Sequence, residues 1–552
     1  MKRSGWFALA AIISFSLLMR TLPLYDYALW GMDAGEYLYY TQRWMESGGS
    51  YLSIDGWGEA YPFFPGIFIL SGAFSSLSGA DLTHSFNFTS VLISGLSPLF
   101  VFLIVHKLMD DWRPAILSSF YFAALPPLIY SYSQPKPETL GFFFLTFILA
   151  LNVTLLREHK KVIVLMMMGV FALIITHHLS TYFLLLMLFG GFFVSRLWRS
   201  KEWPLDRHRM VLFVFFLAAT LSYWLFYATT FAGNRIKGAL GFPSYFIIVV
   251  PFLVLVFLEL LVKLRRRFDI SMPVNVHKQD MKSFLVFIGV ALLIIVPSIL
   301  HVTFGTFPVR DIKLGTTVLV YLPVAVSALL GVSSRKIIKA VAEGPSVIGW
   351  FTFILLSVLG GVLSRSSSLL PMRHVTFLLL SVSILFGIGI VQFHILTNPK
   401  RDMKKTLILS LILFILLASV VPYSFPSQER AGGYTEGVEW EDMEAGFWLK
   451  GSTSRKTATD HRMSSAAFSV ENKNLTWTEG DDMYFSSDLT EGKEDLRYHN
   501  ASYILWDQEM LNGTATQQGQ NPKPLDPELK KDYHDNFYRV YLSEECESYV
   551  VR

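Results

Sequence analysis

Residues 86–105 read FNFTSVLISGLSPLFVFLIV, twenty residues without a charged side chain. A helix of this composition spans the hydrocarbon core of a bilayer, which needs about 20 apolar residues. The whole chain shares the bias, since 52% of its 552 residues are hydrophobic and 16% are charged, against about 25% charged in a typical soluble domain. The composition predicts a polytopic α-helical membrane protein, and the single cysteine, Cys546, excludes a disulfide framework.

Charged clusters separate twelve further apolar runs from this one. They cover residues 5–24, 114–133, 139–156, 162–176, 179–195, 210–230, 245–262, 283–301, 316–332, 347–363, 375–394 and 406–423. The stretch 162–195 is too long for one helix, and we divide it at His177 and His178. We therefore predict about 13 transmembrane helices within residues 1–423, with a first external loop at about 25–84.

The distribution of basic residues gives the direction of threading. If the N-terminus is cytoplasmic, the inner loops and the N-terminus carry 25 of the 34 basic residues of this part, and the outer loops carry nine. Thirteen helices then place residues 424–552 outside the cytoplasm. This tail holds 24 acidic and 13 basic residues. A basic membrane part with an acidic soluble domain argues against a nucleic-acid binder.

The tail is predicted to be a folded mixed α/β domain. Residues 501–506 and 537–542 alternate apolar and polar side chains and indicate strands, and residues 439–449 indicate a helix. The sequons that begin at Asn474, Asn500 and Asn512 are compatible with glycosylation outside the cell.

The first external loop carries two carboxylates three residues apart, Asp33 and Glu36, within residues 30–37 (WGMDAGEY). If a helix starts near Asp33, both carboxylates lie on one face of it at the membrane surface. The same spacing also fits a capping box, with Asp33 at the cap and Glu36 as its partner. Residues 61–65 (YPFFP) follow, and then an apolar stretch to Gly79 that predicts an interfacial or re-entrant helix, with a fourteenth span as the alternative.

This arrangement resembles the GT-C superfamily of membrane glycosyltransferases. The shared features are a first helix, an external loop with Asp-x-x-Glu-Tyr, a Tyr-Pro-x-x-Pro segment, an amphipathic stretch and a second helix. The superfamily includes protein O-mannosyltransferases, aminoarabinose transferases and oligosaccharyltransferase catalytic subunits, which use lipid-linked sugar donors. Thirteen helices with an extracytoplasmic C-terminal domain resemble the oligosaccharyltransferase branch most.

The resemblance implies roles for the acidic residues. Asp33 matches the first-loop acidic residue, which is a general base in metal-independent members and a metal ligand in metal-dependent ones; Glu36 is a second catalytic candidate. Glu138 falls where oligosaccharyltransferases carry further acidic residues, so it is a substrate-binding candidate, with a helix cap as the alternative reading. Asp33 and Glu138 are candidate ligands of a divalent cation (Mn²⁺ or Mg²⁺) only if the enzyme is metal-dependent.

The outward-facing basic residues fit an anionic donor. A lipid phosphate needs Arg or Lys to offset its charge, and Arg binds it with two hydrogen bonds. Arg373 precedes the predicted helix 375–394 and is the main candidate, with Arg310 and Arg235 as further ones; headgroup anchoring is the alternative. His178, beside His177, is a candidate for binding the donor or carrying protons, or else belongs to an interfacial helix end.

Two departures from the oligosaccharyltransferase branch bear on the reaction. The tail contains no Trp-Trp-Asp-x-Gly, and the loop 301–315 lacks the acidic motif of that branch. Transfer of one sugar, with inversion, from a polyprenyl (dolichyl) phosphate to an extracytoplasmic acceptor therefore fits better than transfer of a whole oligosaccharide. We predict a hexosyltransferase of GT-C type, and a mannosyltransferase is one such enzyme.

The alternatives are oligosaccharyltransferase-like transfer to protein, a polymer transferase similar to O-antigen ligases, and a lipid-linked glycan transporter or flippase. The predicted helices are nearly free of charge between their ends, which argues against a transporter. No cytosolic loop carries a nucleotide-binding pattern, which favours an extracytoplasmic site. We expect a multi-pass protein of a prokaryotic, and within that an archaeal, cell membrane, acting on a protein, lipid or glycan.

Overall fold

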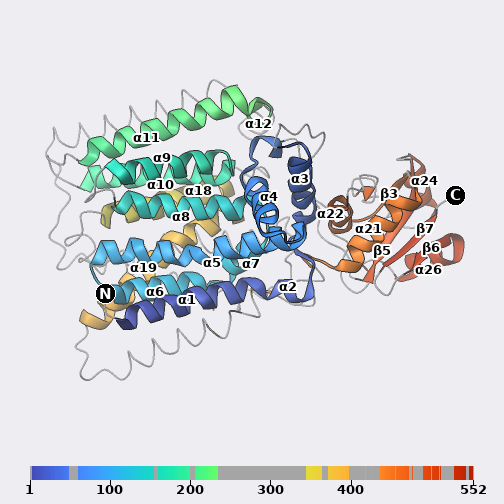
Figure 1. Cartoon of the computed structure of the whole chain (residues 1–552), viewed down its shortest axis with the longest axis horizontal. Helices are drawn as coiled ribbons and strands as arrows, with labels where there is room; N and C mark the ends of the chain where they lie inside the picture. The colour runs from blue at the N-terminus through green and yellow to red at the C-terminus, as the bar shows by residue number, and fades with distance from the viewer. Residues whose placement is uncertain are drawn as a thin grey trace.

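The computed structural model describes most of the membrane part and most of the tail. The described residues are 3–48, 60–154, 160–198, 205–233, 344–363, 371–396, 417, 420, 424, 425, 435–453, 455–470, 475–476, 489–498, 500–508, 510, 527–542 and 546–550. The long helices of the membrane part run roughly side by side, and the tail lies at one end of them (Figure 1).

Helices make up the described membrane part. Its α-helices are α1 (Arg3–Thr21), α2 (Pro23–Asp26), α3 (Ala34–Glu46), α4 (Gly66–Ser78), α5 (Leu82–Met109), α6 (Trp112–Ala123), α7 (Pro126–Ser133), α8 (Pro137–Thr154), α9 (Lys160–Ile174), α10 (His178–Trp198), α11 (Leu205–Ser222), α12 (Thr229–Phe231), α18 (Gly344–Leu363) and α19 (Pro371–Leu396). A 3-10 turn, η1 (Tyr61–Phe63), and a π-helical turn, η2 (Tyr223–Tyr227), complete it.

Five helices of the described part are long and apolar enough to cross a membrane, or six if one bent pair counts as a span. They are Arg3–Asp26, Leu82–Met109, His178–Arg196, Met210–Tyr227 and Arg373–Ile390, with four shorter apolar helices beside them. The predicted runs 245–262, 283–301 and 316–332, and almost all of 406–423, lie outside the described residues. The count of thirteen therefore stays a prediction.

Three details of the predicted spans are resolved. A single helix over 114–133 is wrong: α6 and α7 meet at a bend of 58°. Pro126 and Pro127 explain the bend, because proline lacks an N–H and disfavours the helical conformation of the preceding residue, and Leu125 is extended. The division at His177 is confirmed, since α9 ends at Ile174 and α10 begins at His178. The stretch to Gly79 forms a helix of only 13 residues, α4.

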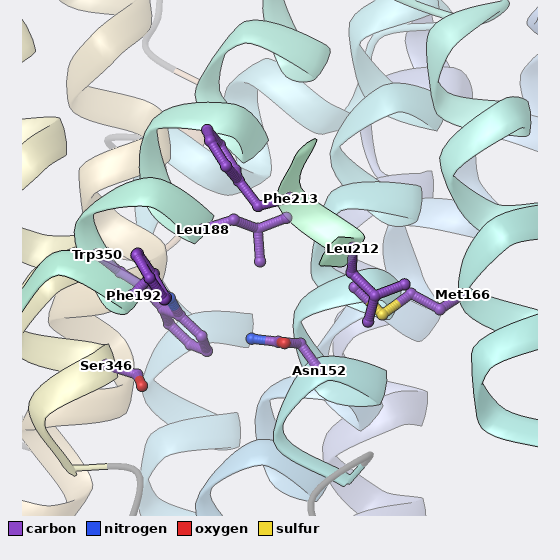
Figure 2. Close-up of a pocket in the computed structure, with 9 residues that line it drawn as sticks. Asn152, Met166, Leu188, Phe192, Leu212, Phe213, Ser346 and Trp350 are labelled. Atoms are coloured by element: carbon purple, nitrogen blue, oxygen red, sulfur yellow. The ribbon is translucent and has the colours of Figure 1, made fainter. Parts of the chain in front are cut away.

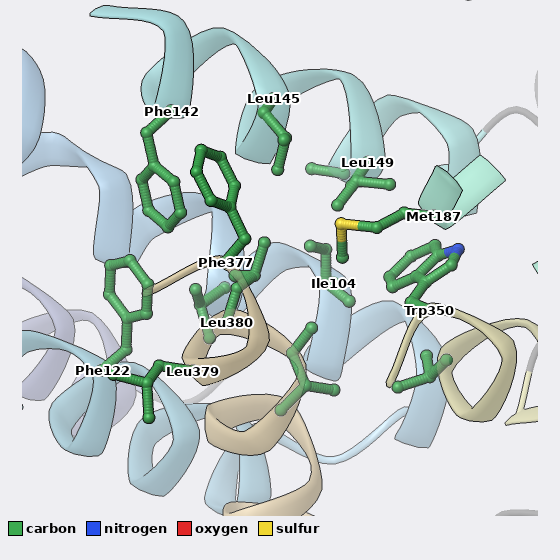
Figure 3. Close-up of a cluster of buried hydrophobic side chains, with 14 of the residues drawn as sticks. Ile104, Phe122, Phe142, Leu145, Leu149, Met187, Trp350, Phe377, Leu379 and Leu380 are labelled. Atoms are coloured by element: carbon green, nitrogen blue, oxygen red, sulfur yellow. The ribbon is translucent and has the colours of Figure 1, made fainter. Parts of the chain in front are cut away.

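The core of the membrane part is aromatic and aliphatic (Figure 3). Phe142, the first residue of a run of three phenylalanines, stacks on Tyr132 with ring centroids 4.2 Å apart and belongs to this core. Helices α10 and α18 cross at Gly190 and Gly349, where an added Cβ would meet backbone atoms. Small residues at such crossings let two membrane helices pack closely.

A small cavity lies among α8, α9, α10, α11 and α18 (Figure 2). It is lined by Asn152, Met166, Leu188, Gly191, Phe192, Leu212, Phe213, Ser346 and Trp350. Its volume of about 10 Å³ is near the minimum that one water needs, so it holds no sugar donor.

The tail folds around a five-stranded sheet. Its strands are β3 (Lys456–Ala458), β4 (Leu475–Thr476), β5 (Ala501–Asp507), β6 (Tyr538–Leu542) and β7 (Cys546–Val550), in the order β4-β3-β5-β7-β6. β3 is parallel to β4 and β5, whereas β7 is antiparallel to β5 and β6. The helices are α21 (Trp440–Ser452), α22 (His461–Ser469), α24 (Leu489–Tyr498) and α26 (Pro527–Asn536). The strands predicted at 501–506 and 537–542 and the helix at 439–449 are thus present.

The tail is docked onto residues 29–46, which belong to the loop predicted to be the first external one. β1 (Leu29–Trp30) pairs antiparallel with β2 (Gly437–Val438), and the N–H of Gly31 donates to the carbonyl of Glu436 at 2.9 Å. Helix α22 packs on α3 (Figure 1). The two helices approach so closely that a Cβ on Gly35 would meet the backbone oxygen of Ser465. This seam places α22 beside Asp33.

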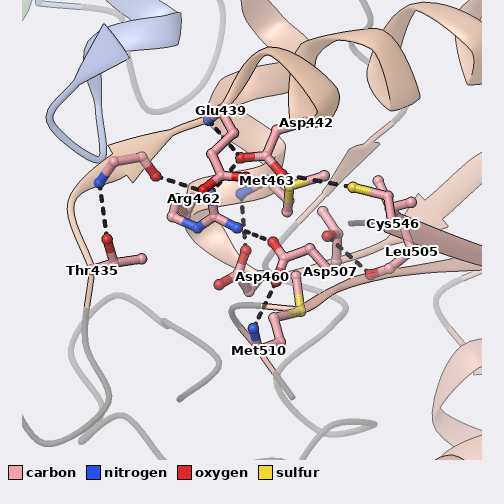
Figure 4. Close-up of polar contacts among 12 residues, drawn as sticks. Thr435, Glu439, Asp442, Asp460, Arg462, Met463, Leu505, Asp507, Met510 and Cys546 are labelled. Atoms are coloured by element: carbon pink, nitrogen blue, oxygen red, sulfur yellow. Dashed lines mark hydrogen bonds and ion pairs between the residues drawn. The ribbon is translucent and has the colours of Figure 1, made fainter. Parts of the chain in front are cut away.

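A buried arginine fixes α22 within the tail (Figure 4). Arg462 is 1% exposed and forms ion pairs with Asp442 and Asp507, while it also donates to the carbonyl of Gly437 at 2.9 Å. Asp460 caps α22 by accepting from the N–H of Met463 at 2.9 Å. The residues on both sides of His461 are therefore held in place.

Candidate active site

Asp33 lies where the membrane part and the tail meet. It precedes α3 in the N-cap position, but its side chain makes no capping hydrogen bond, so the capping-box interpretation is wrong. Its Oδ1 instead lies 2.8 Å from Nε2 of His461 in the tail. The His461 side chain is 2% exposed and that of Asp33 is 30% exposed. One side of the carboxylate is thus held by protein while another is open to a reactant.

The surroundings of Asp33 keep it ionised. Burial alone would raise the pKa of Asp33, but the hydrogen bond and charge of His461, with the charges of Arg373 and Lys136, hold it below its ordinary value. Burial alone would lower the pKa of His461. The hydrogen bond to Asp33 and the charges of nearby carboxylates outweigh burial, so the pKa of His461 is raised. Each of the two groups therefore favours the charged form of the other.

Glu36 lies behind Asp33 and away from solvent. Its side chain is 3% exposed, and burial first, then the charge of Asp33, raises its pKa to about 8. The helix does place both carboxylates near each other, but at neutral pH Asp33 is charged and Glu36 is protonated. A buried, protonated carboxyl is not placed to accept a proton from a reactant.

Replacing Glu36 with glutamine should change how stability depends on pH. The pKa of Glu36 is about 8 in the folded protein, whereas an unfolded glutamate titrates near 4.3. The folded state therefore binds the extra proton between these values, so stability falls as pH rises through this window, by at most about 1.4 kcal/mol per pH unit. Thermal unfolding from pH 5 to pH 9 should show Glu36→Gln gaining stability over wild type as pH rises. A constant difference would contradict it.

Arg373 lies within electrostatic range of the acidic residues. It lies in the first turn of α19, its side chain is exposed, and it interacts electrostatically with Glu138, Tyr61, Tyr37 and Asp33. Among the described residues its guanidinium makes no hydrogen bond or ion pair. An exposed cation of this kind can bind an anionic ligand.

Lys136 and Glu138 lie beside Arg373 at the start of α8. Lys136 donates to Oε1 of Gln134 at 2.9 Å and to Oγ of Ser131 at 3.1 Å, and the charges of Glu138, Arg373 and Asp33 reach it. Glu138 is 4% exposed. The structure therefore gathers Asp33, Glu138, Arg373 and Lys136 around one place, with two carboxylates and two cations.

Two tyrosines also belong to this group of residues. The hydroxyls of Tyr37 on α3 and Tyr61 on η1 lie 2.7 Å apart, and the rings meet edge to face. Both tyrosines interact electrostatically with Asp33 and Arg373. The Tyr-Pro-x-x-Pro segment thus contributes a hydroxyl near the carboxylate of the first loop.

His177 and His178 have different neighbours. The charges of Arg373 and Lys136 reach His177. Its Nδ1 lies 2.9 Å from Oγ of Ser180. The His178 ring packs against Phe64 and Phe231, with centroids 5.2 and 4.5 Å away. Arg235 and Arg310 lie outside the described residues, and their roles stay predictions.

Sequence reasoning missed the tail's contribution. It did not name His461 or Glu436, whose carboxylate accepts from the N–H of Met32 at 2.8 Å and from the Tyr130 hydroxyl at 2.6 Å. It also gave Lys136 no role. The only local signal in the tail is the run Asp460-His461-Arg462, three ionisable residues at the start of a helix of small side chains.

The described part of the site does not supply a ligand set for a divalent cation. Within it no three His, Cys, Asp or Glu side chains gather as metal ligands. His461 occupies Oδ1 of Asp33, and the charges of Arg373 and Lys136 reach both candidate carboxylates, Asp33 and Glu138. Two resident cations oppose the entry of a third, so the reaction proposed below runs through no metal.

The chemistry available is proton removal beside anion binding. An ionised, partly exposed carboxylate can accept a proton from a hydroxyl. An exposed guanidinium and an ammonium can stabilise a departing anion. Both lie where the first external loop meets the ends of α7, α8 and α19.

Comparisons with known proteins identify the fold. No protein-family model matches the chain, and a search of curated proteins gives no match. Among solved structures, the oligosaccharyltransferase of Archaeoglobus fulgidus in its apo form is similar, with a TM-score of 0.59 over 92% of this chain and 70% of its own, at 13% identity. The chain shares the fold of this oligosaccharyltransferase. This confirms the predicted resemblance at the level of fold.

Two further structures agree. AglB, the archaeal oligosaccharyltransferase of Archaeoglobus fulgidus, in complex with an inhibitory peptide and a dolichol-phosphate, matches with a TM-score of 0.59, 12% identity and coverage of 92% of this chain and 70% of AglB. The mycobacterial arabinofuranosyltransferase AftD matches with a TM-score of 0.53 and 12% identity, over all of this chain and 40% of AftD. The five helices of the described part that are long and apolar enough to cross a membrane support a membrane protein.

Proposed function

We propose that the protein is a glycosyltransferase that moves a sugar, a hexose, from a polyprenyl phosphate to a hydroxyl acceptor with inversion at the anomeric carbon. The observation that carries the proposal is the opposition of Asp33 and Arg373: an ionised, half-held carboxylate near an exposed guanidinium that has no bonded partner among the described residues. The GT-C fold supports it, because the similar structures are glycosyltransferases and one of them holds a dolichol-phosphate.

The reaction follows from these charges. The acceptor oxygen attacks the anomeric carbon as its proton passes to Asp33, and the bond from that carbon to the phosphate oxygen breaks. The electron pair leaves with the phosphate, whose charge Arg373 and Lys136 stabilise. Glu138, buried beside them, interacts electrostatically with both cations. We assign proton transfer to Asp33 rather than Glu36, because Glu36 is buried and protonated.

We further propose that the site faces the outside of the cell. The threading of thirteen helices from a cytoplasmic N-terminus puts the first external loop and residues 424–552 on the same side. The docking of the tail on this loop supports a common side for both, since the two strands of the β1–β2 pair lie on one side of the membrane.

A second candidate function is transfer of an oligosaccharide to protein. It is favoured by the similarity to the A. fulgidus oligosaccharyltransferase over 92% of the chain. The absence of Trp-Trp-Asp-x-Gly from the tail sequence favours the single-sugar reaction instead. Membranes that express the chain, supplied with polyprenyl-phosphate monosaccharides or with lipid-linked oligosaccharides, separate the two by which donor loses its radiolabelled sugar. Transfer from neither donor would favour the transporter alternative.

Replacing Arg373 tests the anion-binding half of the site. We expect Arg373→Leu to lower kcat/KM for the donor by about 100-fold, because it removes a charge-assisted partner of the leaving phosphate. Arg373→Lys should lose about 10-fold, since lysine keeps the charge but not the paired hydrogen bonds. The measurement is initial-rate transfer from mannosyl or glucosyl polyprenyl phosphate in proteoliposomes.

Arg43→Leu is the matched control. Arg43 lies on α3 in the same external loop and pairs with Glu46 at the surface, where both side chains are about half exposed. Its replacement should leave kcat/KM within about twofold, because a surface pair contributes little. Equal losses in the Arg43 and Arg373 variants would refute the specific role of Arg373.

A further inference from the structure

Asp33 stands at a position where aspartate normally bonds to its own helix. The residue before the first helical turn is most often Ser, Thr, Asp or Asn, whose side chain accepts from the second or third N–H of the helix. In α3 the third of these N–H groups belongs to Glu36. The Asp33 carboxylate forms no such bond and reaches His461 instead. Something therefore holds this carboxylate away from its most accessible donors.

A residue of the tail accepts the hydrogen bond from the N–H group that Asp33 does not use. The N–H of Glu36 donates to Oγ of Ser465 at 3.3 Å. Ser465 and His461 are four residues apart on α22, so they lie on one face of that helix. A single helical face thus provides a substitute cap for α3 and a partner for the displaced Asp33.

This face is rigidly placed. Asp460 caps α22, and Arg462 ties it to Asp442, Asp507 and the carbonyl of Gly437. Gly35 allows α3 and α22 to approach closely, because a Cβ at this position would overlap the backbone of Ser465. The orientation of Asp33 therefore depends on the tail as a folded body, not on a loose contact.

We propose that His461 and Ser465 are positioning residues that turn the Asp33 carboxylate out toward the acceptor hydroxyl, so that the C-terminal domain completes the active site. The inference rests on the proposed function for the role of Asp33, but not for its orientation. Without the two tail residues, the carboxylate falls back onto the N–H groups of α3 and no longer faces the acceptor.

Three variants in the full chain test the kinetic consequence. His461→Ala should lower kcat by about 10- to 100-fold with the donor KM unchanged, as expected when a reacting group is misplaced. His461→Gln keeps an N–H near the place of Nε2 and should recover to within about fivefold of wild type. Ser465→Ala should lower kcat by about 3- to 10-fold, because the N–H of Glu36 becomes available to Asp33. His534→Ala, an exposed histidine on α26, is the matched control and should leave kcat unchanged.

The outcomes distinguish positioning from a purely structural role. Equal losses in His461→Ala and His461→Gln, or a higher donor KM in both, would overturn the proposal. If His461→Ala does not fold, the comparison of His461→Gln with Ser465→Ala still decides, because a positioning role requires the serine variant to lose rate and the glutamine variant to keep it.

A structure of the His461→Ala variant by electron cryomicroscopy gives a readout without activity. We expect the Asp33 carboxylate on the N–H of Gly35, since Ser465 still accepts from the N–H of Glu36. An unchanged Asp33 would refute the positioning role whatever the enzyme transfers. A turned Asp33 in a protein whose wild type transfers no sugar from any donor would uphold the positioning role and refute the proposed function.

Discussion

Asp33→Asn should lower kcat for sugar transfer by about 10³-fold, within the range of 10²- to 10⁴-fold that general-base catalysis contributes. Asparagine has nearly the same shape, and its Oδ1 can accept a hydrogen bond from a histidine N–H, so the seam with His461 is kept. An amide, however, takes no proton from the acceptor. The donor KM should stay near the wild-type value, because Arg373 and Lys136 are unchanged.

Transfer of radiolabelled sugar in membranes with equal amounts of wild-type and variant protein measures this effect, with and without EDTA. Wild-type transfer that resists EDTA, together with loss in Asp33→Asn, would establish Asp33 as the base. Full activity of Asp33→Asn would refute the assignment of the site. Loss of wild-type transfer on EDTA treatment would instead return Asp33 and Glu138 to the role of metal ligands.

The second large effect concerns Arg462 in the tail. Arg462→Leu leaves the carboxylates of Asp442 and Asp507 buried at 1% and 2% exposure without their cation. Breaking a buried ion pair by removing one partner costs about 3–5 kcal/mol. We expect the tail to unfold first in this variant, at a clearly lower temperature than in wild type. Sugar transfer should fail at the same temperature, because His461 is adjacent to Arg462 in the sequence.

Protease protection of the tail along a temperature ramp, in the full chain in detergent, measures this loss. Arg455→Leu is the control, since Arg455 is exposed in the same domain. A tail of Arg462→Leu that resists protease as well as wild type would show that the two aspartates find other partners. Restoration of resistance by adding Asp442→Asn and Asp507→Asn would support the unpaired charges as the cause.

Local sequence patterns predicted much of the fold, because they depend on neighbours along the chain. Apolar length located the spans that are described, and alternation located two strands of the tail, β5 and β6. The break between α6 and α7 was missed although Pro126 and Pro127 mark it, since the run around them is long enough for one helix. Hydropathy alone weighs a proline only as an apolar residue.

Some of the residues that the membrane part contributes to the site were predictable from the sequence, whereas the residue that the tail contributes was not. The resemblance pointed to Asp33 and Arg373, and the structure brings them within electrostatic range of each other. His461 carried no such signal, because it bonds Asp33 across 428 residues of sequence and the pairing depends on how the tail docks. The position of Asp33 before a helix also favoured the capping interpretation, which only the competing bonds of α22 exclude.

The pairing of β1 with β2 joins residue 29 to residue 438, so it also fixes an order of events during synthesis. The first loop emerges early, as chains are made from the N-terminus. Its partner strand and His461 follow more than 400 residues later in the chain. If the tail turns Asp33 as proposed, a chain still in the translocon holds an unturned Asp33, and activity would begin only when synthesis and docking of the tail are finished.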